Sequence, residues 1–156
     1  MNSLDRLGSA VAPAIEITPA RARPIILVAD DNDDNRDMMR VLLGLKGYDV
    51  IVADNGKEAI ELALTKSPDL ILLDLVLPMM DGLTIARNLL SHQKFIKVPI
   101  VVVSGHDPRK YKQAALEAGC SDFLLKPISF ERLDEILQSS APVPNGNSEV
   151  LVLPNN

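Results

Sequence analysis

The sequence is poor in residues that bind transition metals or form disulfides. Cys120 is the single cysteine among 156 residues, which excludes an intramolecular disulfide framework and a cysteine-rich metal site. The two histidines, His92 and His106, have no second ligand at metal-binding spacing. These absences favour a soluble protein of a reducing compartment, and we expect a cytoplasmic location.

Long apolar segments and nucleotide-binding motifs are also missing. No stretch approaches the roughly 18 apolar residues that span a bilayer, and the N-terminus has no apolar segment of a secretory signal. No P-loop or dinucleotide-binding fingerprint occurs in the chain. The net charge of −5 argues against a nucleic-acid surface. We therefore expect neither a membrane nor a nucleic acid as a direct partner.

Length and composition favour one globular domain between two flexible segments. A hydrophobic fraction of 47% is normal for a soluble domain and too high for general disorder. Residues 1–23 show no sustained apolar period, and residues 139–156 are rich in Pro, Asn, Gly and Ser. We predict a flexible leader over 1–23, a domain over 24–138 and a flexible tail over 139–156. A small apolar segment, residues 149–153, lies within the tail.

Five short apolar runs alternate with five segments of helical periodicity. Runs that are apolar throughout are typical of strands covered on both faces. Five runs of this kind, interrupted or bounded only by Asp49, Asp74 and Asp122, occupy residues 25–29, 48–53, 70–74, 99–103 and 122–125. Strands that alternate with helices through short turns predict an α/β fold, with a parallel sheet between two layers of helices.

The helical segments are each predicted to bury one apolar stripe. In the first, we expect Asp33 or Asp34 as the N-cap. Its stripe follows the spacing i, i+3, i+4, i+7 and consists of Met38, Val41, Leu42 and Leu45. In the last segment, the residues predicted to face inward are Phe130, Leu133 and Leu137.

Polar side chains stand at the carboxyl ends of four predicted strands. Asp30 and Asp31 follow the first strand, Asp74 ends the third, Ser104 follows the fourth and Lys126 follows the fifth. Parallel strands bring these ends to one edge of the sheet, where ligands bind in open α/β folds. Carboxylates packed together repel one another, and a hard divalent cation relieves the repulsion. The pattern therefore predicts a Mg²⁺ site.

This set of residues suits phosphoryl transfer to a carboxylate. A carboxylate is a competent nucleophile that forms an aspartyl phosphate. The transfer itself needs mainly positioning and neutralisation of the phosphoryl oxygens. Mg²⁺ held by Asp31 and Asp74 would bind one oxygen, while Lys126 and the Ser104 hydroxyl would bind the others.

Five motifs resemble those of response-regulator receiver domains, the phosphoacceptor domains of two-component signalling. They are I-L-V-A-D-D-N at 26–32, A-D-N-G-K-E-A at 53–59, L-L-D-L-V-L-P-M-M-D-G at 72–82, V-V-V-S-G-H at 101–106 and A-G-C-S-D-F-L-L-K-P at 118–127. They cover about residues 24–138. The resemblance implies a flavodoxin-like (βα)5 fold, doubly wound, with strand order 2-1-3-4-5.

The resemblance also implies the chemistry of the site. Asp74 would be the phosphorylated residue. Asp30, Asp31 and Asp74 would bind Mg²⁺ together with the backbone carbonyl of Val76. Lys126 would pair with the phosphate, and its peptide bond to Pro127 would be cis. The chain would then be a phosphoacceptor with slow self-dephosphorylation rather than an enzyme.

Switching and partners follow from the same resemblance. Ser104 would move toward the phosphate, and Phe123 would be the switch aromatic. Val76 and His106, two positions after Asp74 and Ser104, would tune the lifetime of the phosphate through access of water. The phosphoryl donor would be a histidine kinase or a phosphotransfer protein. The output would be a downstream protein or a homodimer that binds through residues 108–138.

Three alternatives fit the sequence less well. A haloacid-dehalogenase-type phosphatase needs Thr or Val where Asn35 stands, and the chain is short for that fold. An EF-hand that starts at Asp30 needs Gly at 35 and Glu at 41, where Asn35 and Val41 stand. A receiver that serves only as a scaffold would not keep the full polar set.

The chain is expected to act either as a stand-alone receiver or as a fragment of a larger regulator or hybrid kinase.

Overall fold

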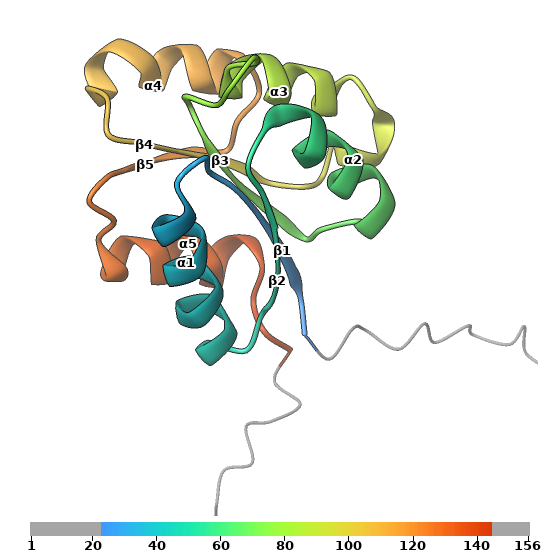
Figure 1. Ribbon diagram of the computed structural model, residues 1–156, viewed down its shortest axis with the longest axis vertical. Helices are drawn as coiled ribbons and strands as arrows, with labels where there is room; N and C mark the ends of the chain where they lie inside the picture. Colours follow the sequence, from blue (N-terminus) through green and yellow to red (C-terminus); the bar gives the residue numbers. More distant parts are fainter. Residues whose placement is uncertain (1–22, 145–156) are drawn as a thin grey trace, which may run out of the picture.

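A parallel five-stranded sheet forms the centre of the computed structural model, which describes residues 23–144 (Figure 1). The strands are β1 (Ile25–Ala29), β2 (Asp49–Ala53), β3 (Leu70–Asp74), β4 (Ile100–Ser104) and β5 (Asp122–Leu125). The helices are α1 (Asp33–Leu45), α2 (Gly56–Lys66), α3 (Gly82–Leu90), α4 (Pro108–Glu117) and α5 (Phe130–Ser140), and η1 (Gln93–Phe95) is a short 3-10 helix. The strand order is β2-β1-β3-β4-β5, so the predicted fold class and strand order are confirmed.

Each strand of the sheet contributes side chains to two separate cores. On β4, Ile100 and Val102 belong to the core beneath α2, α3 and α4, while Val101 and Val103 belong to the core beneath α1 and α5. Figure 1 shows the two layers of helices on opposite faces of the sheet. Successive side chains point to opposite faces, so a strand buried on both faces must be apolar at every position. This explains the unbroken apolar runs in the sequence.

The predicted buried stripe of α1 is wrong. The buried residues of this helix are Met39 and Leu43, whereas Met38, Val41 and Leu45 are exposed. Leu42 lies between these two groups and is partly buried. The helix carries apolar residues on two adjacent stripes, so periodicity alone did not identify the stripe that packs against the sheet.

In α5 the prediction was wrong at one position. Leu133 and Leu137 are buried as predicted, but Phe130 is exposed at the first position of the helix. The short helix η1 was not predicted, and its Phe95 is completely buried in the core beneath α2, α3 and α4. Three residues of 3-10 helix are too few to produce a periodic pattern.

Side-chain caps begin all five α-helices of the described chain. In each case an oxygen of the capping side chain accepts a hydrogen bond from a backbone N–H of the first turn. The caps are Asn32, Asn55, Asp81, Asp107 and Ser129. The predicted N-cap of α1, Asp33 or Asp34, is therefore wrong, because Asn32 takes that place. Asp33 and Asp34 lie in the first turn, where negative charge stabilises the helix dipole.

The two ends of the described chain lie at the same end of the sheet, opposite the polar strand ends (Figure 1). Arg23 donates to Asp49 Oδ1 at 3.0 Å and to the backbone carbonyls of Gly44 and Tyr48. Gly47 ends α1 with a φ of 98°, and a Cβ placed on it would lie 3.4 Å from a methyl carbon of Val143. Arg23 and Val143 thus both lie beside the C-terminus of α1.

The structure describes less than the full predicted leader and tail. Helix α5 continues to Ser140, and the buried Ala141 follows it, so the packed part of the chain extends past residue 138. Residues 1–22 and 145–156 lie outside the described residues, and the predicted flexible segments stay predictions there. None of the described helices has the length and apolar character required to cross a membrane.

Candidate functional site

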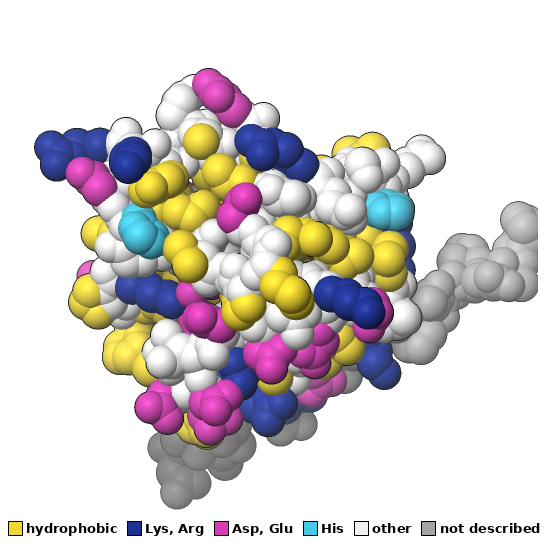
Figure 2. Space-filling view, turned by 45° about the horizontal axis from the view of Figure 1, so that its top comes forward, with side chains coloured by type: hydrophobic (Ala, Val, Ile, Leu, Met, Phe, Trp, Pro, Cys, Tyr) yellow, Lys and Arg dark blue, Asp and Glu magenta, His cyan; other side chains and the backbone are white. Residues whose placement is uncertain are grey.

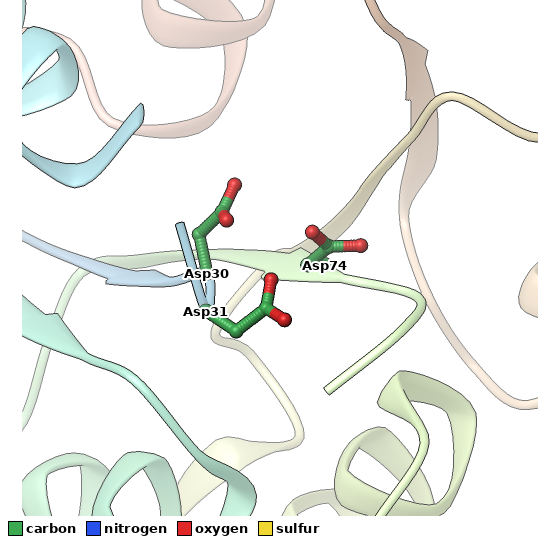
Figure 3. Close-up of side chains that lie close together, drawn as sticks. All are labelled: Asp30, Asp31 and Asp74. Carbon is green, nitrogen blue, oxygen red and sulfur yellow. The ribbon is translucent and has the colours of Figure 1, made fainter. Parts of the chain in front are cut away.

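Three aspartates from two neighbouring strands form an acidic cluster. Asp30 and Asp31 follow β1, and Asp74 ends β3, which pairs with β1 through Ala29 and Leu73. One carboxylate oxygen from each aspartate lies within 4.8 Å of those of the other two (Figure 3). Asp30 and Asp74 are buried, while Asp31 is exposed. The predicted convergence of these residues is confirmed by their positions.

The donor set of this acidic cluster fits a hard divalent cation. All three side chains offer oxygen ligands, and the group includes neither histidine nor cysteine. Oxygen-only sites with few protein ligands are typical of Mg²⁺, which keeps part of its water shell. The exposed carboxylate of Asp31 leaves the site accessible from solvent. Most acidic side chains on the face seen in Figure 2 lie in its lower half, where Lys and Arg side chains lie among them.

Lys126 supplies the positive charge in contact with the cluster. Its Nζ lies 2.9 Å from Asp30 Oδ2 and 2.9 Å from Asp74 Oδ2. Burial lowers the pKa of Lys126, but the hydrogen bonds and charges of Asp30 and Asp74 outweigh this, and the pKa is raised overall. The ammonium is therefore charged at neutral pH. Three carboxylates and one ammonium leave two negative charges, which a divalent cation would balance.

Two residues that sequence analysis did not select hold Asp30 in place. Asn35 Nδ2 donates to Asp30 Oδ2 at 3.3 Å, and Arg36 Nη1 donates to the Asp30 backbone carbonyl at 2.7 Å. The N–H of Asn32 donates to the other carboxylate oxygen at 2.9 Å. Asn35 and Arg36 lie five and six residues after Asp30, in the first turn of α1. This spacing was the sequence signal from which their contact with Asp30 could have been predicted. Neither residue type is specific for this role.

The loop after β3 fixes the position of Asp74. The N–H of Val76 donates to Asp74 Oδ1 at 3.0 Å, and the Val76 side chain is 53% exposed. Gly82 at the start of α3 packs directly on the same strand end, and its N–H donates to the Leu75 carbonyl at 2.8 Å. A Cβ on Gly82 would lie 2.3 Å from the Asp74 carbonyl oxygen. The close approach therefore requires glycine.

Ser104 and Phe123 lie on the two strands beyond Asp74. Asp74 pairs with Val103 on β4, so Ser104 is the next residue along that strand. The Ser104 side chain is completely buried, and its Oγ accepts a hydrogen bond from the N–H of His106 at 3.1 Å. Phe123 on β5 pairs with Val102 and is buried in the core beneath α2, α3 and α4. Strand β4 thus lies between Asp74 on β3 and Phe123 on β5.

His106 and Pro127 lie in the loops around the site. The His106 ring packs edge-on against the Tyr111 ring, with 5.5 Å between the ring centroids. The peptide bond between Lys126 and Pro127 is cis, as the resemblance implied. These loops follow β4 and β5, the two strands beyond β3 on the side away from β1.

A cavity of about 330 Å³ lies beside the acidic cluster, between α1 and α5. Its lining includes Asp30 and Lys126 from the cluster and Met38, Ile128 and Phe130 from the flanking segments. The cavity is mainly apolar, so it suits a hydrophobic side chain better than an ion. It adjoins the cluster without including Asp31 or Asp74.

Comparison with known proteins gives a family and several relatives. The family model described as "Response regulator receiver domain" matches residues 26–138. "Response regulator MprA" of Mycolicibacterium vanbaalenii is 38% identical over 108 residues, which are 69% of this chain and 46% of that protein. "Polar-differentiation response regulator DivK" of Brucella anthropi is 32% identical over 114 residues, which are 73% of this chain and 93% of DivK.

Solved structures give the same result. The receiver domain of the sensor histidine kinase PA1611 from Pseudomonas aeruginosa superposes with a TM-score of 0.70 at 30% identity. The match covers 76% of this chain and 97% of that one. The chain spans about half the length of several of the curated relatives that it matches. With the family model, these similarities show that the chain belongs to the response-regulator receiver domain family.

Proposed function

We propose that Asp74 accepts a phosphoryl group in a reaction that requires Mg²⁺ bound by Asp30, Asp31 and Asp74. The observation that carries the proposal is the pair of 2.9 Å contacts from Lys126 to Asp30 and Asp74. One carboxylate oxygen of Asp74 lies next to a fixed ammonium, in a cluster that keeps excess negative charge. Such a pocket neutralises incoming phosphoryl oxygens once a cation is present.

The reaction is a displacement at phosphorus. A carboxylate oxygen of Asp74 attacks the phosphorus atom, the bond from phosphorus to the donor breaks, and its electron pair leaves with the donor. The bound Mg²⁺ supplies charge neutralisation, and the Val76 carbonyl is proposed as a further ligand. Lys126 would turn its ammonium from Asp74 to the new phosphate. The PA1611 receiver domain was solved with a magnesium ion coordinated in its active-site cleft, which supports the choice of metal.

A histidine kinase or a phosphotransfer protein is the proposed phosphoryl donor. Response regulators interact with histidine kinases, and this chain has the receiver domain of that class. The given sequence has no P-loop or dinucleotide-binding fingerprint, so a nucleotide is not the proposed donor.

The proposed output is a change in the surface formed by residues 108–138. A phosphate on Asp74 would draw the Ser104 hydroxyl toward it, and Phe123 on the neighbouring strand would repack in response. Packed cores prefer discrete arrangements, so this pair can act as a two-state element. The exposed charges of α4 and α5 are mixed in sign, with Lys110 and Lys112 on one helix and Glu131 and Glu135 on the other. Such a surface suits a protein partner or a second copy of the chain.

Slow self-dephosphorylation is proposed from the two side chains that border the path of water. Val76 is exposed and has no polar group to orient a water molecule. His106 is bulky and exposed, and its ring packs edge-on against the Tyr111 ring. We expect Val76→Asn or His106→Ala to change the decay rate of the phosphorylated protein. An unchanged rate in both variants would show that neither side chain controls the water.

The test of the phosphoacceptor uses acetyl phosphate as a small donor. With Mg²⁺ the protein should gain one phosphoryl group by mass spectrometry, and Asp74→Asn should gain none. Asp31→Asn should need a higher Mg²⁺ concentration for the same labelling. Asp54→Asn is the matched control, because Asp54 follows β2 but lies outside the acidic cluster. Undiminished labelling of Asp74→Asn would overturn the proposal.

The switch is tested separately with beryllofluoride and Mg²⁺, which imitate a bound phosphoryl group. Amide shifts are expected to extend from Asp74 through Ser104 to Phe123 and α5. Shifts confined to the loops at Asp30, Asp74 and Lys126 would show that the site binds the group without switching the surface.

A further inference from the structure

Helix α1 exposes a second apolar stripe that no described segment covers. Met38, Val41 and Leu45 are 42%, 65% and 83% exposed, and their spacing of i, i+3, i+7 places them on one face of the helix. The other apolar stripe, Met39 and Leu43, already packs in the core. Single exposed apolar residues are normal on a protein surface, but three in a row on one helix form a continuous patch.

The cavity between α1 and α5 extends this patch toward the acidic cluster. Met38 lines the cavity at one side, and Phe130, which is 58% exposed, lines it at another. The α1 patch, defined here as Met38, Val41 and Leu45, thus continues from the C-terminus of the helix to the edge of the phosphoacceptor site. A strip of this shape suits a short extended apolar segment.

We propose that residues 150–153 of the same chain bind the α1 patch. These residues are V-L-V-L, four consecutive aliphatic residues in a segment otherwise rich in Asn, Pro and Gly. An aliphatic run of this kind gains free energy when it is removed from water. It is also the part of the predicted tail that the proposed function does not use. Its chemistry matches the patch, which is aliphatic.

The chain leaves the described structure at the correct place for this contact. Val143 lies beside Gly47, two residues after Leu45, and Pro144 is the last described residue. Position 150 is six residues after position 144, which allows a reach of about 20 Å. The patch from Leu45 to Met38 is about 10 Å long, at 1.5 Å per residue. Residues 145–147 are Asn-Gly-Asn, a composition that favours chain reversal.

The short sequence distance between the end of the described structure and residues 150–153 also favours the contact. The loop that must close between Val143 and Val150 is short, so the entropy lost on closure is small. A second copy of the chain would have to bring the same segment from solution and would lose more entropy on association. The geometry therefore favours the contact within one chain.

The experiment measures paramagnetic broadening in the full chain. A nitroxide is attached to the thiol of Ser148→Cys, and amide signals of α1 are compared with those of α2. Burial raises the pKa of Cys120 to about 11, although the charge of Arg87 lowers it slightly, so the native thiol stays protonated and unreactive at neutral pH. The signals of residues 38–45 should lose more than half of their intensity, while those of α2 should keep theirs.

Substitutions then separate specific binding from simple proximity. Leu45→Asn and Leu151→Asn should each restore most of the lost intensity at residues 38–42. Leu64→Asn is the matched control, because Leu64 is also an exposed leucine near the end of a helix, and it should change nothing. Leu45 is exposed, so Leu45→Asn should leave the melting temperature nearly unchanged and the fold intact.

Two results would overturn the proposal. The first is broadening that is equal in the unsubstituted, Leu45→Asn and Leu151→Asn proteins, which would mean undirected motion near α1. The second is broadening of the α1 signals in a mixture of isotope-labelled protein without nitroxide and unlabelled protein with nitroxide. That result would assign the patch to a contact between two copies. Neither outcome depends on phosphorylation, so the test is independent of the proposed function.

Discussion

The two ends of the sheet handle charge in opposite ways. At the amino end of the strands two acids each have their own base: Lys46 Nζ lies 2.6 Å from Asp134 Oδ1, and Arg23 Nε lies 3.0 Å from Asp49 Oδ1. At the carboxyl end Asp30 and Asp74 share the ammonium of Lys126, and Asp31 adds a third carboxylate to the same cluster. The two pairs at the amino end are balanced one to one, whereas the acidic cluster keeps an excess of negative charge.

The difference separates stabilising charge from functional charge. Paired and partly exposed ions contribute a few tenths of a kcal/mol to about 1 kcal/mol each. Clustered carboxylates oppose folding until a cation or a further proton balances them. A protein tolerates this repulsion where a ligand supplies the balancing positive charge. Functional sites commonly have such a loss of stability. The carboxyl end is therefore the part of the molecule whose stability should respond to Mg²⁺.

The largest expected effect comes from Gly82→Ala at the carboxyl end. Its Cβ would lie 2.3 Å from the Asp74 carbonyl oxygen, so either α3 or the end of β3 must move. We expect a loss of about 3 kcal/mol in the free energy of unfolding, the upper range for overpacking. Urea denaturation measures the loss, and the rate of labelling by acetyl phosphate should fall in parallel.

Gly44→Ala is the matched control for Gly82→Ala. Gly44 lies within α1 toward the opposite end of the sheet, and a Cβ there would meet no atom within 4 Å. Alanine in a helix interior is more favourable than glycine by about 0.5–1 kcal/mol, so this variant should be more stable than the unsubstituted protein. Equal effects of the two substitutions would contradict the packing argument.

Asp31→Asn should increase stability in the absence of Mg²⁺. The change removes one charge from the acidic cluster, and Asp31 is the exposed member, so no buried contact is lost. We expect a gain on the order of 1 kcal/mol from reduced repulsion. Adding Mg²⁺ should raise the melting temperature of the unsubstituted protein more than that of the variant. A loss of stability without Mg²⁺ would show that the cluster does not repel itself.

The N-cap of α3, Asp81, gives a smaller effect at the carboxyl end of the sheet, through the pH dependence of stability. A hydrogen bond from the Thr84 N–H lowers the pKa of Asp81, partly opposed by burial. A carboxyl whose pKa is lower in the folded state stabilises the fold above its unfolded value of 3.8, and this contribution disappears as the pH falls through the folded value. Asp81→Asn keeps a capping oxygen without titrating. Its stability should fall less between pH 5 and pH 2, by about 0.5 kcal/mol.

An equally small effect is expected of Asp134→Asn at the amino end. It is the same chemical change as Asp31→Asn, but it removes the partner of Lys46. We expect a loss of about 0.5 kcal/mol, because the pair is partly exposed. Burial raises the pKa of Tyr48, and the charge of Asp134 raises it further, so the variant should also titrate Tyr48 at a lower pH. Opposite signs for the two Asp→Asn variants would establish the difference between the ends.

Much of the fold was predictable because its signals are local. Five short and mainly apolar runs identified the strands, since a strand buried on both faces has few other sequences. The cluster of Asp30, Asp31 and Asp74 was predictable because parallel strands bring their carboxyl ends together. Failures occurred where the signal was local but ambiguous. Asp33, Asp34 and Asn32 are all good capping residues, and only the geometry of the first turn selected Asn32.

The sequence by itself determined the order of the elements, the acidic residues at the strand ends and the family to which the chain belongs. The tertiary structure decided which stripe of α1 is buried, because both Met38 and Met39 are apolar and only packing against the sheet distinguishes them. It also decided that Lys126 contacts Asp30 and Asp74, which are 96 and 52 residues away. Contacts between residues so far apart in the sequence depend on how the strands are ordered in the sheet. No local pattern of residues gives the distance between two such side chains.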